Sequence, residues 1–512
     1  MNALRSWRAG LMAGVAFGLV PVLALPAVAQ DAEGGTLTVA RPADIFTFDP
    51  YNTQDDRSIF TELTVYERLV RLSEDGTSVE PELATEWSVA EDGLSAEFTL
   101  RDGVQFWNGD PLTAEDVVFS LTRAIDQAGS WGFLFSPVQS VEAVDENTVR
   151  LTMSQPFAPL LPALSTFAAS IYQKAHFEEQ GEAAGESPMG TGAFMLESWN
   201  KGQDLTLVRN PNYWQESKPT LERVVFRVVG DDNARMLQLA SGEVDIATDV
   251  PPGQVEQATA NGAEIVTVPG SAVGFVTING QVEPFDEASV RCAMAYAVDR
   301  ESIAQAVYFG RATPAKSILP SSTFFYDADT NPITFDLAKA RELLASSEMP
   351  DGFTFTATVP SGDTTRLAIA QIWAASLAEI GITMNIEQVE ATTAQEMYNT
   401  EQYTMRISSW TNDTPDPDEL MGVAMDYEPQ NGLHSGYRND EARDLVLAGR
   451  AEPDSEKRQE IYSELQEIVN RDCPFIYTVE EERIFAISPN VEGFAPNSQG
   501  KYSLENVTLA SG

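Results

Sequence analysis

Hydrophobic and polar residues alternate with a period of two in several short stretches of the chain, and helix-like spacing follows most of them. Alternation predicts strands at residues 36–41 and 146–156. Apolar residues at helical spacing predict a helix at about 58–72, and another that begins after Thr113 with Asp116 three residues later, a variant of the capping box. Because strands and helices alternate repeatedly, we expect an α/β fold.

A second body with the same alternation begins near Ala272. The pattern predicts helices at 286–308, 336–346, 365–380 and 441–470, and strands at 273–279, 353–360, 384–388 and 403–410. An acidic, proline-containing turn, "WTNDTPDPD", follows the last of these strands at residues 410–418. Its two prolines fix φ and remove backbone donors, so we expect a stiff loop.

The first 29 residues have the pattern of an export signal. Arg5 and Arg8 precede an apolar run at 11–25, and Ala27-Val28-Ala29 precedes Gln30. The cleavage region contains no cysteine that could carry a lipid. We therefore expect a soluble periplasmic protein whose signal peptide, residues 1–29, is cleaved and which is not lipidated.

Length, charge and cysteine content narrow the possibilities further. The 512 residues, 43% of them hydrophobic, exceed the roughly 250 to 300 residues that one core usually serves, so two or more lobes are expected. A formal charge of −45 repels polyanions and excludes nucleic acid as a partner. Cys292 and Cys473, the two cysteines, either pair or remain separately buried thiols, and the sequence leaves both options open.

Four stretches occur in a characteristic order: "LTAEDVVFSLTRA", "GTGAFMLESWNKGQDLTLVRNPNYW", "ERVVFRVVGDDNARMLQLASGEVDI" and "VRCAMAYAVDRESI". Behind an export signal, they resemble the blocks shared by the family 5 extracellular solute-binding proteins of ABC importers, the peptide and nickel binding group. The resemblance implies a monomeric α/β protein with two lobes, an extra subdomain and a hinged cleft. Such a protein needs no cofactor and delivers its ligand to the transmembrane subunits of an ABC permease.

The same resemblance implies the domain boundaries. Lobe I comprises residues 30–60, 187–272 and 481–512, the extra subdomain of lobe I comprises 61–186, and lobe II comprises 273–480. The chain then crosses between the lobes near Ser271 and near Glu480, which are the expected hinge positions.

The acidic turn is the main candidate for ligand binding. By resemblance, Trp410 and Asp413, with Thr411 and Asn412 between them, match a Trp-x-x-Asp turn at the cleft, in which the aspartate pairs with the α-amino group of a peptide. A carboxylate on a stiff turn loses little entropy on binding. We interpret Asp416 and Asp418 as structural or solvated.

The residue that would bind a ligand carboxylate is less clear from the sequence. Dipeptide-binding relatives have an arginine where this chain has Pro360. Arg366 is the nearest arginine, and Arg406 shares a strand face with Trp410. A strand arginine in a surface ion pair is the alternative for Arg406.

Five further residues are candidates for the cleft wall. Trp131 and Phe133 match the place of an aromatic that relatives bring from the extra subdomain, or else are buried subdomain aromatics. Phe46 and Thr47 follow the first strand, where ligands gather in α/β lobes. Asn279 either binds ligand or caps its strand.

Other functions have weaker support. An enzyme would need a base, and the chain has two histidines, His176 and His434, without a recognisable catalytic motif. A nickel chelate is an alternative ligand because His434 lies downstream of the acidic turn, although a solvent-exposed histidine is the simpler interpretation. An opine or an oligosaccharide is a further alternative, and a longer peptide or another amine-bearing solute fits the acidic turn as well as a small peptide does.

Overall fold

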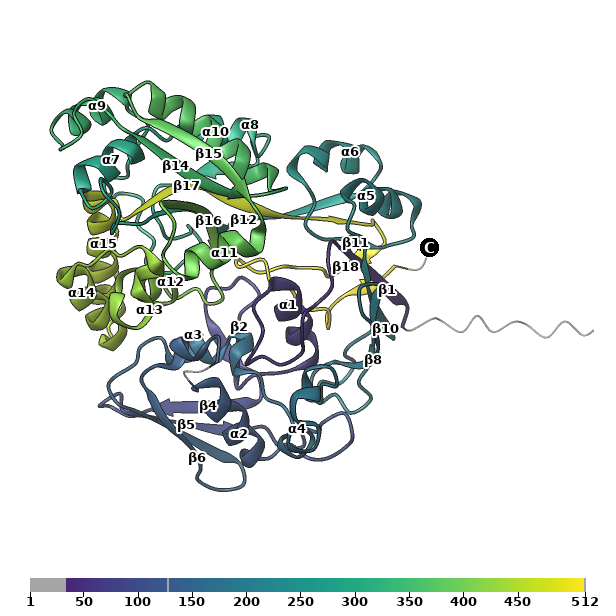
Figure 1. Ribbon diagram of the computed structural model, residues 1–512. Coiled ribbons are helices and arrows are strands. Elements are labelled where there is room, and N and C mark those ends of the chain that lie inside the picture. Colours follow the sequence, from purple (N-terminus) through teal and green to yellow (C-terminus); the bar gives the residue numbers. More distant parts are fainter. Residues whose placement is uncertain (1–33, 127–128, 511–512) are drawn as a thin grey trace, which may run out of the picture. The chain divides into compact units, whose positions relative to one another are not determined.

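The structure, a computed structural model, describes residues 34–126 and 129–510. The predicted export signal lies outside the described residues. Strands and helices alternate along the described chain (Figure 1), which confirms the predicted α/β class. The strand predicted at 36–41 and the capping box of Thr113 and Asp116 are both confirmed.

Among the described residues, nine strands form the largest sheet, in the order β16-β12-β17-β11-β1-β10-β9-β8, with β13 paired to β17. Its strands are β1 (Thr36–Arg41), β8 (Phe194–Asn200), β9 (Asp204–Arg209), β10 (Arg223–Val228), β11 (Ile246–Ala247), β12 (Glu264–Ile278), β13 (Ala312–Pro314), β16 (Met405–Thr411) and β17 (Phe475–Ile487). Because β16 pairs only with β12, it is an end strand of this sheet.

Smaller sheets account for the remaining described strands. The four-stranded sheet contains β4 (Ala84–Val89), β5 (Ser95–Leu100), β7 (Thr148–Met153) and β6 (Val138–Ala143), in that order. Three pairs are β2 (Val70–Leu72) with β3 (Val79–Pro81), β14 (Thr354–Pro360) with β15 (Thr383–Val389), and β18 (Val491–Glu492) with β19 (Thr508–Leu509).

The helices fall into two groups along the sequence, one before β12 and one after it. The helices before β12 are α1 (Asp56–Val65), α2 (Ala114–Ala124), α3 (Leu160–Leu164), α4 (Lys174–Gln180), α5 (Asp232–Ser241) and α6 (Val255–Ala260), with 3₁₀ turns η1 (Gly132–Phe135), η2 (Phe167–Ala169), η3 (Gly181–Gly185) and η4 (Pro252–Gln254). The helices after β12 are α7 (Ala288–Tyr296), α8 (Arg300–Ala306), α9 (Leu337–Ala345), α10 (Thr364–Ala378), α11 (Ala391–Asn399), α12 (Asp418–Met425), α13 (Tyr427–His434), α14 (Asp440–Ala451) and α15 (Ser455–Asp472).

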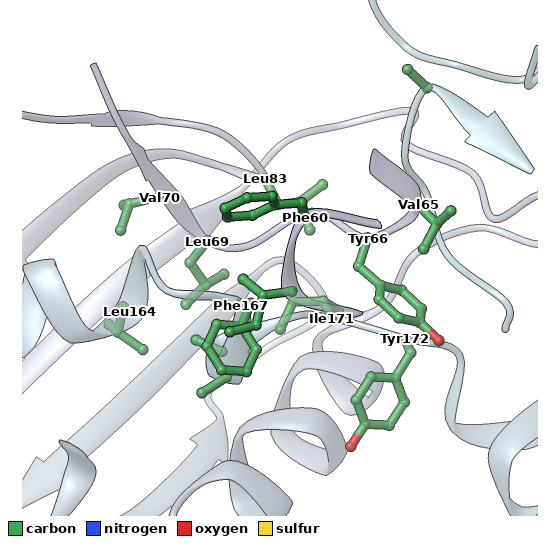
Figure 2. Close-up of a cluster of buried hydrophobic side chains, with 14 of the residues drawn as sticks. Phe60, Val65, Tyr66, Leu69, Val70, Leu83, Leu164, Phe167, Ile171 and Tyr172 are labelled. Atoms are coloured by element: carbon green, nitrogen blue, oxygen red, sulfur yellow. The ribbon is translucent and has the colours of Figure 1, made fainter. Parts of the chain in front are cut away.

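The hydrophobic core of the described chain is divided at β12 and β17. One large cluster draws on residues 37–268 and 485–507, and a second draws on 273–479. A smaller cluster lies around α5 and α6. Figure 2 shows part of the first cluster, in which side chains from residues 60–83 pack with side chains from 164–172.

Two long strands connect the main clusters. β12 and β17 pair antiparallel from Glu264 opposite Ile487 to Thr277 opposite Phe475, and in Figure 1 they run side by side. The pairing register shifts between Val268 and Ala272, so the ladder is interrupted where the first cluster ends and the second begins. A bulge of this kind bends a strand locally.

A disulfide closes the second cluster. Cys292 on α7 is bonded to Cys473, which ends α15, across a separation of 181 residues. Of the two options that the sequence left open, the structure has the paired one.

The structure corrects several predicted helices. The helix predicted at 58–72 ends at Val65, because residues from Glu67 onward take extended backbone that pairs with Ile171 and forms β2. The helix predicted at 286–308 is two helices, since Asp299 caps a new one. The helix predicted at 441–470 is also two, interrupted before the cap residue Asp454.

Three of the helices that follow β12, and part of one strand, escaped the sequence analysis. No helix was predicted at α11, α12 or α13. The strand predicted to begin at 273 is the second half of β12, which already begins at Glu264. The early start matters because the strand therefore runs through the predicted boundary near Ala272 rather than starting there.

Candidate functional site

One face of the end strand β16 carries the polar residues of a cavity. Arg406, Ser408 and Trp410 are all partly exposed, and Met405 and Ile407 are buried, so burial alternates over the first half of the strand, whereas Ser409 further along is exposed. This alternation is what a half-buried strand dictates. All three partly exposed side chains line a cavity of about 340 Å³.

The walls of this cavity come from distant parts of the chain. Phe133 of η1 lines it from the first half of the sequence, and Tyr398 of α11 and His434 of α13 line it from the second half. Phe133 also packs against both large core clusters. The cavity therefore lies where residues of the two core regions meet.

A second cavity, of about 440 Å³, adjoins the first. Both are lined by Tyr398 and Arg406. The second adds Pro360, Asp363 and Arg366, at the end of β14 and the start of α10. We call the two together the Arg406 cleft.

Arg406 is the distinctive charge of this cleft. Its guanidinium lies 4.0 Å from the centre of the Tyr398 ring, and its Nη2 donates to Gln395 Oε1 at 3.1 Å. No acidic side chain pairs with it within the described residues. Burial lowers the pKa of Arg406, and the nearby charge of Arg366 acts in the same direction. The surface ion pair considered from the sequence is not formed.

The other charged side chains in the lining of the cleft, Arg366 and Asp363, pair with each other. Arg366 Nη1 donates to Asp363 Oδ2 at 2.8 Å, and Asp363 is the acidic residue in the lining of the two cavities. His434 packs edge-on against Tyr398, and its Nδ1 lies 3.5 Å from Glu401 Oε1. The cleft is thus net positive in a strongly acidic protein.

Trp410 also lines the cleft and carries a donor of its own. Its Nε1 is buried and has no hydrogen-bond partner among the residues that the structure describes. A buried donor without a partner costs about 1–3 kcal/mol. An acceptor on a bound ligand would remove that cost.

Asp413 lies in a different environment from Trp410. Its carboxylate Oδ1 is 2.8 Å from Lys501 Nζ, and the same ammonium donates to the Asp413 carbonyl oxygen at 2.7 Å. Asp413 and Lys501 are both buried. They line a separate cavity of about 150 Å³, whose other walls include Tyr213 and Glu505. Binding of a ligand amine by Asp413 stays a prediction.

The rest of the acidic turn is structural, as interpreted from the sequence. Arg458 donates to both oxygens of Asp416, at 2.8 and 2.9 Å. Arg450 Nε donates to Asp418 at 3.0 Å. The backbone N–H groups of Asp413 and Thr414 donate to the Glu419 carboxylate. These interactions hold the turn in one conformation.

Three of the predicted wall residues of the first half lie outside the Arg406 cleft. Phe46 is 75% exposed. Thr47 is buried and its hydroxyl accepts from Asp49 N. Trp131 packs edge-on against Phe167 and donates from Nε1 to Thr53 O at 2.7 Å. Phe133, rather than Trp131, reaches the cleft.

Three predicted residues of the second half make interactions within the protein. Asn279 is buried and donates to the carbonyl oxygens of Glu401 and Tyr403. Asn412 donates to Thr323 Oγ1 at 2.7 Å. Thr411 ends β16 opposite Ala272. Their roles as ligand contacts stay predictions.

Sequence reasoning missed two residues that matter at these sites. Tyr398 lies on α11, a helix that was not predicted. Lys501 lies in the C-terminal tail, 88 residues from Asp413, and no local pattern connects the two. Only a prediction of tertiary contacts would have found that pair.

The described residues offer little support for a metal site. Within residues 34–126 and 129–510, no group of three histidine, cysteine or acidic side chains is arranged to hold a metal ion. His176 Nε2 lies 2.6 Å from Ser187 O. In the same part of the chain, no helix has the length and apolar character needed to cross a membrane.

Comparison with known proteins identifies close relatives over nearly the whole chain. The family model described as bacterial extracellular solute-binding proteins, family 5, matches residues 78–431. The "Probable D,D-dipeptide-binding periplasmic protein DdpA" of Escherichia coli K12 is 31% identical over 90% of this chain and 91% of its own. The glutathione-binding protein GsiB of Salmonella typhi is 30% identical over 95% of this chain and 96% of its own.

A solved structure gives the corresponding match in three dimensions. The ABC transporter-associated periplasmic binding protein DppA from Helicobacter pylori, in complex with the peptide STSA, superimposes with a TM-score of 0.82. It is 28% identical in sequence, and the match covers 93% of this chain and 98% of that one. The fold is therefore that of the two-lobed periplasmic binding proteins.

Proposed function

The chain belongs to the bacterial extracellular solute-binding proteins of family 5, and from this membership we propose that it captures a small peptide in the Arg406 cleft. As a member of this family it is the substrate-binding component of an ABC import system. The observation that carries the choice of ligand is Arg406, a partly buried guanidinium in a cavity wall without an acidic partner among the described residues.

A peptide carboxylate satisfies the unpaired donors of the cleft. The guanidinium of Arg406 presents its donors in a planar arrangement that suits a carboxylate. Trp410, whose Nε1 is unpaired among the described residues, lies on the same strand face as Arg406. A carboxylate bound here would receive charge-assisted hydrogen bonds, which are about twice as strong as neutral ones.

The remainder of a peptide has complementary surfaces in the same place. β16 is an end strand, and end strands carry unpaired backbone groups that an extended peptide can join. Phe133, Phe275 and Tyr398 supply apolar and aromatic wall for its side chains. The three relatives named above support this class of ligand. Two are named as binding proteins for a D,D-dipeptide and for glutathione, and the third was solved in complex with a peptide.

The remaining features of the proposal follow the family. We place the mature protein in the periplasm, without residues 1–29 and without a lipid. In this proposal it is a monomer, and it releases its ligand chemically unchanged. In this proposal lobe I comprises residues 30–60, 187–272 and 481–512, and lobe II comprises residues 273–480. Residues 61–186 form the extra subdomain of lobe I. The division of the core clusters at β12 and β17 supports these boundaries.

A ligand screen tests the proposal. Thermal shift and then isothermal titration would compare dipeptides and tripeptides with opines, nickel chelates and oligosaccharides, since a ligand stabilises only the native state that binds it. We expect peptides to bind and expect amidation of their carboxyl terminus to weaken binding. Binding of an oligosaccharide or a nickel chelate, with no peptide bound, would contradict the proposal.

A pair of arginine variants locates the site. Arg406→Gln removes hydrogen bonds to a charged group, each worth about 1.5–3 kcal/mol, so peptide affinity should fall roughly 10- to 100-fold. Arg366→Gln is the matched control, because Arg366 is already paired with Asp363, and its effect should stay within about threefold. Equal effects of the two substitutions would place the carboxylate elsewhere.

A further inference from the structure

Two residues form the boundary between the two cavities of the Arg406 cleft. Tyr398 and Arg406 line both the cavity of about 340 Å³ and the cavity of about 440 Å³. The same two residues stack on each other, with the guanidinium 4.0 Å from the centre of the ring. Groups at this separation are in van der Waals contact, so a peptide cannot pass between them. The stacked pair is therefore a partition across the cleft.

Both members of the partition are held in place by neighbouring residues. The hydroxyl of Tyr398 donates to Leu433 O at 2.8 Å. Its ring contacts His434 edge-on, with 4.8 Å between the ring centres. Arg406 donates from Nη2 to Gln395 Oε1 on α11 at 3.1 Å. The partition is thus anchored on the side of the smaller cavity, which Leu433 and His434 also line.

The two sides of the partition differ in what they offer a peptide. The smaller cavity is lined by Phe133 and by Trp410, whose Nε1 is unpaired among the described residues. In the larger cavity, the charged side chains of Arg366 and Asp363 pair with each other. A peptide therefore finds an unsatisfied donor on the smaller side. The volume of that side is within the roughly 300–1,000 Å³ typical of sites for small ligands.

A carboxylate bound by Arg406 places the carboxyl end of the peptide at the partition. The rest of the chain then occupies the smaller cavity, towards Trp410. Two additional residues in extended conformation span roughly 7 Å, and the ring of Tyr398 blocks their entry into the larger cavity. A steric block of this kind lowers the affinity for longer ligands and leaves that for shorter ligands unchanged.

We propose that Tyr398 is a specificity-determining residue: stacked on Arg406, its ring closes the larger cavity to the ligand and limits the protein to peptides of about two or three residues. This inference rests on the proposed function and names its substrate class more narrowly. Removal of the ring joins the two cavities and makes the larger one available to longer peptides.

A series of alanine peptides tests the length limit. Peptides of two, three, four and five L-alanine residues are titrated calorimetrically into the mature protein. The pentapeptide should bind the wild type at least about tenfold more weakly than the tripeptide. In Tyr398→Ala this ratio should fall to about threefold or less, whatever the change in overall affinity. Equal affinity of the wild type for both peptides, or an unchanged ratio in Tyr398→Ala, would overturn the inference.

Three further variants separate a partition from a general effect on the site. Tyr398→Phe keeps the ring and loses the bond to Leu433, so the wild-type ratio should remain. Phe133→Ala enlarges the smaller cavity without opening the partition, and it should weaken binding of all lengths alike. Ser361 lines the larger cavity, so Ser361→Trp, added to Tyr398→Ala, should fill that cavity and restore the wild-type ratio. A lowered ratio in Tyr398→Phe, or a double variant that behaves as Tyr398→Ala, would overturn the inference.

The fold and the two levels of the proposal can be checked separately. No residue of α11 is buried, so Tyr398→Ala should retain the circular dichroism spectrum of the wild type, and the wild-type length series needs no variant at all. If no alanine peptide binds the wild type, the proposed function is contradicted and this inference with it. If all lengths bind equally, the function stands and the role of Tyr398 is wrong.

Discussion

At the scale of single residues, the described structure contains several buried acids whose protonation affects stability. Glu67 is one of them. Its carboxylate accepts from Thr191 Oγ1 at 2.7 Å and from Trp214 Nε1 at 2.8 Å. Burial and the charge of Glu82 raise the pKa of Glu67 to about 8. Arg68 opposes this rise, but it is engaged with Glu82.

The raised pKa of Glu67 can be checked by measuring the free energy of unfolding as a function of pH. The folded pKa of Glu67 lies above its unfolded value of 4.5. The contribution of the protonated carboxyl to the stability of the fold is therefore complete below pH 4.5 and is lost as pH rises towards about 8. In that window the free energy of unfolding should fall by up to about 1.4 kcal/mol per pH unit. In Glu67→Gln, which cannot lose a proton, the decline should be shallower.

Urea unfolding of both proteins at pH 5, 6, 7 and 8 gives the comparison. Glu86→Gln is the control, because Glu86 is an exposed residue of β4. Parallel curves for Glu67→Gln and the wild type would show that Glu67 is already ionised in the folded state.

Interactions between single residues are also what sequence reasoning predicted least well. Trp410 became a candidate through its motif, and Arg406 became one because it shares a strand face with Trp410. Asp413 was found by its motif, but not its partner, since Lys501 is distant in sequence. Motifs identify residue types, whereas pairing depends on the tertiary structure that brings two segments together.

At the scale of elements, local signals were sufficient where they were strong. The capping box at Thr113 and the strand at 36–41 are set by neighbouring residues and were predicted correctly. The helix at 58–72 was extended too far because long-range backbone pairing with Ile171 competes for residues after Tyr66. Tertiary contacts of this kind override helix propensity.

The disulfide is the element-scale feature with the clearest consequence for stability. It ties α7 to the end of α15 across 181 residues. Closing a loop of this length contributes up to about 5 kcal/mol in the loop-entropy estimate. Cys292→Ala breaks the bridge and leaves Cys473 unchanged, which avoids placing alanine at a residue with a φ of 50°.

Calorimetry with and without reductant would check this. Cys292→Ala should unfold at a lower temperature than the oxidised wild type. Dithiothreitol should lower the midpoint of the wild type and leave the variant unchanged. If the oxidised wild type and the variant unfold together, the bridge adds no stability.

At the scale of the whole described chain, the core clusters and the Arg406 cleft together suggest how ligand binding acts. Phe133 belongs with the first half of the sequence and β16 with the second, and both line the cleft. β12 and β17 join the two large clusters, and their register shifts between Val268 and Ala272. We propose that the lobes close about this irregular part of the ladder, near the crossings expected at Ser271 and Glu480.

Closure should be measurable as a change in size. A peptide that contacts both Phe133 and β16 favours the closed arrangement by the difference in its affinity for the two states. We expect the radius of gyration from small-angle X-ray scattering to fall when the wild type is saturated with peptide. Phe133→Ala should bind more weakly and show a smaller change, because the part of the cleft wall that comes from the first half of the sequence is lost. Arg406→Gln at the same peptide concentration is the control for unbound protein. A constant radius of gyration at saturation, verified by titration, would mean that the ligand enters a cleft that is already closed.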